Sequence, residues 1–120
     1  MRGRWRGLLV GVLLATVGAC GQAASSCPDD EPAACPSPAP SFSGQVQDIF
    51  ARKCDACHAP GGVESSKPFV TYAQISPRDT RLSIESRIVS CNMPQAGAPQ
   101  LTEDERLALL GWLVCGGPNN

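Results

Sequence analysis

Apolar residues recur at helical spacing in three stretches of the chain after residue 42. In the first of these, Val46, Ile49 and Phe50 fall on one face of a helix that we predict over residues 44–54. Ser43 directly precedes this helix and is the expected N-cap, because its hydroxyl can accept a hydrogen bond from a backbone N–H of the first turn.

The second helical stretch covers residues 79–91. Its apolar face is formed by Leu82, Ile84, Ile88 and Cys91. We expect it to end before Pro94, because proline disfavours helical backbone at the preceding residue. A shorter helical turn is predicted over residues 71–76, with Thr71 as its cap.

The last helix has the clearest signals. Thr102 and Glu105 have the spacing of a capping box, and Gly116 is placed to end the helix. Its apolar positions are Leu107, Leu109, Leu110, Trp112, Leu113 and Val114. Because no hairpin pattern accompanies the helices, we predict an all-α domain over residues 43–118, with three main helices and long loops. A domain of this size is marginal on its own apolar core.

The first 19 residues are predicted to be a signal peptide rather than part of the fold. Basic residues precede an apolar run that ends at Ala19 and is shorter than the ~20 residues that span a bilayer. The ending before Cys20 resembles a bacterial lipobox, which implies that Cys20 is lipidated and becomes the first residue of the mature chain. The alternative is an ordinary cleavage site with Cys20 as a thiol or in a disulfide. We therefore expect an exported protein that is anchored to a bacterial membrane. The residue after Cys20 is Gly21 and not the aspartate that retains many lipoproteins at the inner membrane, so the outer membrane is preferred.

Residues 20–42 are predicted to be the lipidated cysteine followed by a linker. The segment is rich in Pro, Ser and Ala and has no apolar period, so it cannot bury enough surface to fold. Removing the signal peptide leaves seven basic against eleven acidic residues, a formal charge of −4. This balance excludes the clustered basic face of a nucleic-acid-binding protein, and it favours partners with a basic patch.

The residues Cys54, Cys57 and His58 carry the candidate chemistry. The C-x-x-C-H pattern is typical of c-type haem attachment, in which two thiols bond the porphyrin vinyl groups and the histidine ligates iron. In a helical turn these three residues lie on one face, while Asp55 and Ala56 point elsewhere. A zinc knuckle or a thiol-redox site is the alternative for a C-x-x-C pair.

Residues 43–118 resemble a small class I-type cytochrome c domain, and the whole chain resembles bacterial cytochrome c lipoproteins. The resemblance rests on a helix before the C-x-x-C-H motif, a downstream Met93-Pro94 and a closing helix with an aromatic residue. It implies that Phe50 packs with Leu109 and Trp112 where the first and last helices cross. The loop after His58 is short for this family, and whether Pro60 or Pro68 takes the place of the proline that the family has near the proximal histidine stays open.

The resemblance also implies one covalent haem c with His58 and Met93 as axial ligands. Met93 is the only methionine left after signal-peptide removal. Its alternative role is an ordinary core side chain, with Lys53 or Lys67 as sixth ligand, or with an open site. A six-coordinate iron leaves no place for a substrate, so we expect a monomeric electron carrier and not an enzyme, with redox proteins as partners. A haem peroxidase or gas sensor with a displaceable sixth ligand, and a haem-free metal-binding or thiol-redox module, are the alternatives.

Four further cysteines allow three disulfide pairings, of which we predict Cys91–Cys115 and Cys27–Cys35. The first pairing would tie the chain beside Met93 to the last helix. Three polar residues could reach the haem propionates or could be solvated surface groups: Tyr72, Arg78 and Arg81.

Overall fold

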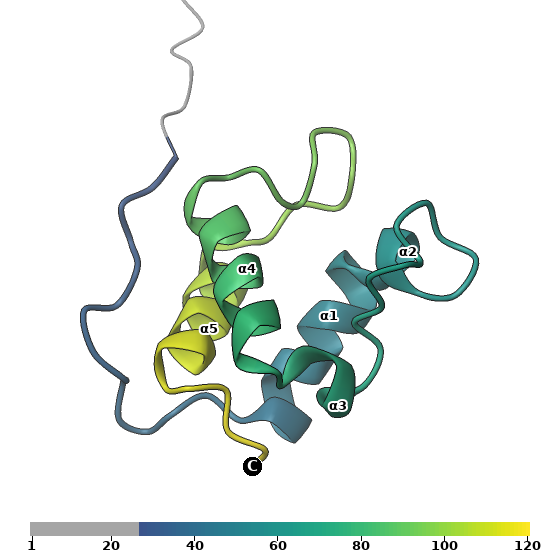
Figure 1. The fold of residues 1–120 in the computed structure, drawn as a ribbon. Coiled ribbons are helices and arrows are strands. Elements are labelled where there is room, and N and C mark those ends of the chain that lie inside the picture. The colour runs from purple at the N-terminus through teal and green to yellow at the C-terminus, as the bar shows by residue number, and fades with distance from the viewer. Residues whose placement is uncertain (1–26) are drawn as a thin grey trace, which may run out of the picture.

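The computed structural model describes residues 27–120, and this part of the chain is helical, without a β-strand. Its elements in chain order are η1 (Phe42–Val46), α1 (Gln47–Lys53), α2 (Asp55–His58), α3 (Tyr72–Ile75), α4 (Arg78–Val89) and α5 (Glu103–Val114). Helices α4 and α5 lie side by side, and α1 and α2 stand across from α4 (Figure 1). The predicted all-α architecture is confirmed, while the predicted signal peptide and Cys20 lie outside the described residues.

The first helix begins earlier than predicted, with a π-helical turn. Ser41, not Ser43, is its N-cap, because the Ser41 hydroxyl accepts from the Gly44 N–H at 3.1 Å. The Val46 N–H reaches back five residues to the Ser41 carbonyl at 3.0 Å, which defines the π-turn. The Ser43 hydroxyl instead donates to the Asn120 carbonyl at 2.9 Å, so the end of the chain is fixed against the start of this helix.

The predicted capping box of α5 is confirmed. The Glu105 N–H donates to Thr102 Oγ1 at 3.2 Å, and the Thr102 N–H donates to Glu105 Oε2 at 2.8 Å. Beyond the helix, Gly116 adopts the left-handed conformation that commonly ends helices (φ 82°). Helix α4 ends at Val89, two residues before the predicted end, because Cys91 takes the same left-handed conformation (φ 55°).

The core forms where α5 packs against η1 and α4. Its buried apolar side chains are Phe42, Val46, Ile49, Phe50, Ile75, Ile84, Ile88, Leu109, Leu110, Trp112 and Leu113. The ring of Phe50 meets that of Trp112 edge-on at 6.5 Å, which brings together the first and last helices. Leu82 and Leu107, placed by the sequence on apolar faces, are exposed. Arg106 is the one charged side chain buried in the described part of the chain.

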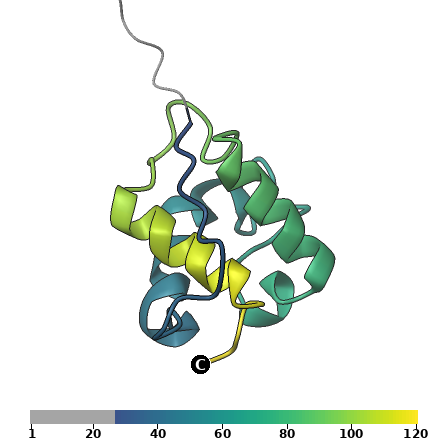
Figure 2. The same ribbon diagram turned by 90° about the vertical axis from the view of Figure 1, so that its left-hand side faces the viewer.

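Residues 27–41, which we call the N-terminal strap, correct the prediction of a flexible linker. The strap has no helix or strand, but it lies along the outer face of α5 (Figures 1 and 2). Pro36 and Pro40 pack over Gly111, where an added Cβ would come within 3.1 and 3.3 Å of their Cγ atoms. The strap is held by two disulfides and an ion pair, so low apolar content did not prevent it from being ordered.

The disulfides are Cys27–Cys91 and Cys35–Cys115, so both predicted pairings are wrong. The strap runs along α5 (Figure 2), so Cys27 and Cys35 each bond a cysteine elsewhere in the domain and not each other. Cys91 and Cys115 in turn lie at opposite ends of α5, a helix about 18 Å long. The strap therefore supplies one partner to each end of this helix. Two disulfides indicate an oxidising, non-cytosolic compartment.

Candidate functional site

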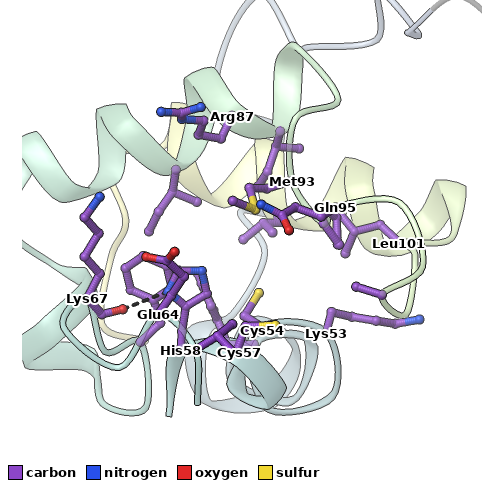
Figure 3. A pocket seen from close by; sticks show the side chains of 18 of the residues that line it. Lys53, Cys54, Cys57, His58, Glu64, Lys67, Arg87, Met93, Gln95 and Leu101 are labelled. Carbon is purple, nitrogen blue, oxygen red and sulfur yellow. Dashed lines mark hydrogen bonds between the residues drawn. The ribbon is translucent and has the colours of Figure 1, made fainter. Parts of the chain in front are cut away.

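A cavity of about 600 Å³ separates α1 and α2 from α4 and the loop that follows it (Figure 3). Its volume falls within the range of sites that hold small molecules and cofactors. The apolar residues on its walls include Phe50, Val63, Phe69, Ile84, Ile88, Leu101 and Leu109. The cavity therefore offers a large apolar ligand a pocket inside the helical domain.

Cys54, Cys57 and His58 lie together on one wall of this cavity (Figure 3). Cys54 sits at the junction of α1 and α2, and its carbonyl accepts the His58 N–H at 3.0 Å, which closes the helical turn. Neither cysteine forms a disulfide. Asp55 and Ala56 do not line this cavity, in keeping with the predicted helical face.

The imidazole of His58 is fixed from two sides. Its Nδ1 lies 2.9 Å from the Lys67 carbonyl oxygen, and because a carbonyl only accepts, Nδ1 must carry the proton. Nε2 then keeps its lone pair for a metal, the arrangement common to metal-ligating histidines. The ring of Phe69 stacks on the imidazole at 4.3 Å and meets Phe50 edge-on at 6.1 Å. The carbonyl that binds His58 belongs to Lys67, which directly precedes Pro68, and not to Pro60 or Pro68 itself.

The loop after His58 returns to the motif through backbone contacts. The Glu64 N–H donates to the Cys57 carbonyl at 2.8 Å. Gly62 passes so close that an added Cβ would lie 2.2 Å from the Cys57 carbonyl oxygen. This close approach requires glycine, and it lets a short loop carry Lys67 back to His58.

Met93 lies on the opposite side of the cavity from Cys54, Cys57 and His58 (Figure 3). It follows α4 directly, and its N–H donates to the Arg87 carbonyl at 3.1 Å.

Of the two lysines considered as sixth ligands, Lys53 is already engaged. Its ammonium donates to the Gln100 carbonyl at 2.7 Å and pairs with Glu105 at 3.1 Å. Lys67 lies in the loop whose backbone bonds His58, so it belongs to the same wall of the cavity as the imidazole and not to the opposite wall. Met93 is thus better placed than either lysine to face His58 across the cavity.

The three polar residues considered for haem carboxylates do not line the cavity. The Tyr72 hydroxyl donates to the Gly117 carbonyl at 2.9 Å, and Arg81 donates to the Ser76 carbonyl at 2.5 Å. The basic residues on the cavity walls are instead Lys53, Lys67 and Arg87.

The surroundings of the cysteines bear on the zinc and thiol-redox alternatives. Burial, with smaller effects from Asp55 and Cys57, raises the pKa of Cys54 to about 12, whereas thiol-redox sites depend on a lowered thiol pKa. Cys27, Cys35, Cys91 and Cys115 are bound in disulfides, so they cannot complete a zinc site. Over residues 27–120 no three His, Cys, Asp or Glu side chains are grouped as a metal cluster.

The residues present fit a covalently bound haem. Two unpaired thiols, an imidazole with its Nε2 available and a thioether across an apolar cavity are the donors that such a group requires. No family model, curated protein or solved structure matches the chain. None of the helices in residues 27–120 is long and apolar enough to cross a bilayer.

The sequence alone did not single out Gly62, Phe69 or Arg106. Gly62 follows another glycine shortly after the motif, and such a glycine can signal a close approach of the backbone. Arg106 precedes the buried Leu109, Leu110 and Leu113 by three, four and seven residues, which is the spacing of one helical face. That spacing could have placed Arg106 on the buried side.

Proposed function

We propose that this chain is a monohaem c-type cytochrome that carries electrons at a bacterial membrane. The observation that carries the proposal is the arrangement of Cys54, Cys57 and His58 on one wall of an apolar cavity with Met93 on the other. When bound, haem c supplies a one-electron iron couple.

Each residue of the site has a distinct part in that function. Cys54 and Cys57 hold the porphyrin through thioether bonds. His58 is oriented by Lys67 and Phe69 so that Nε2 faces a metal, and Met93 supplies a second, sulfur ligand. With His58 and Met93 both bound to the iron, the site would leave no open place on the metal for a substrate. Electron transfer needs no such place, whereas catalysis does.

The pairing of a histidine and a methionine ligand also affects the reduction potential of the iron. A methionine ligand favours the reduced iron more than a second histidine would, and burial in an apolar cavity acts in the same direction. The carrier is therefore expected to work at higher potential than a bis-histidine cytochrome.

The decisive experiment is expression of the full chain, signal peptide included, in a bacterial host that matures c-type cytochromes. A pyridine haemochrome spectrum should show one c-type haem per chain, and Cys54→Ser/Cys57→Ser should abolish it. A colourless native preparation would refute the proposal. Rapid binding of carbon monoxide or cyanide by the native protein would instead favour a sensor or peroxidase.

The membrane location can be tested separately. The intact chain should partition with the membrane fraction, and Cys20→Ser should release the haem-containing protein to the soluble fraction. Equal partitioning of the two proteins would show that Cys20 is not the anchor.

A further inference from the structure

Arg106 joins the N-terminal strap to the end of α4. It is only 8% exposed, and its Nε donates to both carboxylate oxygens of Asp30, at 2.9 and 2.8 Å. Nη1 donates to the Ile88 carbonyl at 2.6 Å, and Nη2 to the Pro28 carbonyl at 3.3 Å. All three guanidinium nitrogens are therefore used to hold the strap against α4, and a buried charge so fully paired is costly to disturb.

The Cys27–Cys91 disulfide lies directly beside this guanidinium. Nη1 is 3.9 Å from the Cys91 sulfur, and Nη2 is 4.0 Å from the Cys27 sulfur. Disulfide, guanidinium and the Asp30 carboxylate form a single unit, which we call the strap junction: Cys27, Asp30, Cys91 and Arg106.

Cys91 occupies a position that usually belongs to glycine. Its φ of 55° is left-handed, and the N–H groups of Cys91 and Asn92 donate to Ile88 and Arg87 at 2.9 Å each, which is the Schellman ending of a helix. A side chain at this position is unfavourable, so a cysteine here points to a requirement for its sulfur.

Met93 follows this fixed point after one intervening residue. Its own N–H donates to the same Arg87 carbonyl as that of Asn92. The direction in which the chain leaves α4, and hence the place of Met93 in the cavity, is set at Cys91.

We propose that the strap junction is a positioning device for Met93, which keeps its thioether turned to the cavity and in place as an axial ligand. This inference rests on the proposed haem function. It assigns to the N-terminal segment a part in ligand retention, apart from any part in membrane attachment.

The second disulfide provides a matched control. Cys35–Cys115 also ties the strap to the domain and closes a comparable length of chain, 80 residues against 64, but it lies at the other end of α5. Cys27→Ser/Cys91→Ser and Cys35→Ser/Cys115→Ser should thus lower the thermal midpoint of unfolding to a similar degree. Only the first should act on Met93.

The readouts are the weak far-red absorption of sulfur-ligated ferric haem and the rate of cyanide binding to the ferric protein. Loss of Cys27–Cys91 should weaken the band and speed cyanide binding about tenfold or more, because the Met93 segment then opens without global unfolding. Loss of Cys35–Cys115 should leave both nearly unchanged. Hydrogen exchange at Asn92 and Met93 should quicken in the first variant only.

Asp30→Asn keeps both disulfides and gives the same readouts should the first double variant not fold. It should speed cyanide binding by a smaller factor, and Asp30→Glu should restore the slow rate. A Met93 signature that is equally stable in both disulfide variants, or equally weakened, would overturn the inference and leave the proposed function intact. A native chain without haem would overturn both.

Discussion

The Nδ1 of His58 lies 2.9 Å from the backbone carbonyl oxygen of Lys67. The partner is a backbone atom, so the contact survives any change of the Lys67 side chain. What holds the imidazole from the other direction is the Phe69 ring, stacked at 4.3 Å. The two contacts together fix both the tautomer and the ring plane of His58.

Phe69→Ala should therefore destabilise the protein, whereas Lys67→Ala should not. We expect a loss of about 2–3 kcal/mol for Phe69→Ala, because the half-buried ring packs against both His58 and Phe50. Urea unfolding followed by circular dichroism measures the loss. Similar destabilisation by the two variants would mean that the Lys67 side chain, and not its carbonyl, matters.

Met93→Leu separates ligation from packing. Leucine conserves the volume, so the free energy of unfolding of the haem-free protein should change by less than ~1.5 kcal/mol. The far-red absorption band should vanish, the midpoint potential should fall, and cyanide should bind ferric haem rapidly. Leu101→Met, a comparable exchange elsewhere in the cavity lining, should leave all three haem properties as they are. Retention of the band in Met93→Leu would exclude Met93 as the ligand.

Gly62→Ala tests the close approach of the loop to the Cys54–His58 segment. The added Cβ would meet the Cys57 carbonyl oxygen at 2.2 Å, and backbone must move to relieve the clash. We expect a loss of about 2 kcal/mol or more in the free energy of unfolding, together with a lower yield of haem attachment. Ser65→Ala, at an exposed position in the same loop, is the control and should behave as wild type.

The acid stability of the domain should depend on Glu105. The hydrogen bond from the Thr102 N–H, with those from Arg52 and Lys53, outweighs the effect of burial and lowers the pKa of Glu105 from 4.5 to about 2. A lowered carboxyl pKa contributes stability above the unfolded-state value, and this contribution is lost as the pH falls from 4.5 through 2.

Glu105→Gln keeps the capping box, since glutamine also serves there, but loses both ion pairs. At pH 7 it should be less stable than wild type by on the order of 2 kcal/mol, and the difference should shrink toward pH 2. Urea unfolding at several pH values measures this. Glu103→Gln, on the same helical turn but unpaired within residues 27–120, should show no such pH dependence.

Local signals in the sequence predicted the helices well, because caps and helical spacing act over a few residues. Thr102 with Glu105 set the start of α5, and Thr71 set that of α3. The course of the strap was not predictable in this way. Its order comes from Cys27, Cys35 and the pairing of Asp30 with Arg106, which join residues far apart in the chain.

In the candidate site too, the local contacts were predictable from the sequence and the long-range ones were not. The spacing of Cys54, Cys57 and His58 placed them on one wall, because a single helical turn determines it. The Lys67 carbonyl could not be chosen from the sequence, since every residue has one. A short loop and the absence of a Cβ at Gly62 bring it to the imidazole.

The strap would also shorten a tether formed by a lipid on Cys20. With Cys27 bonded to Cys91, only residues 21–26 separate the domain from Cys20, a span of at most about 25 Å even when fully extended. A lipid on Cys20 would thus keep the Met93 edge of the protein near the headgroups and the Asn120 end turned outward. A protein held in this way would not sweep a wide volume for electron donors and acceptors. It would meet them by lateral diffusion, in a thin layer over the bilayer, with one preferred face.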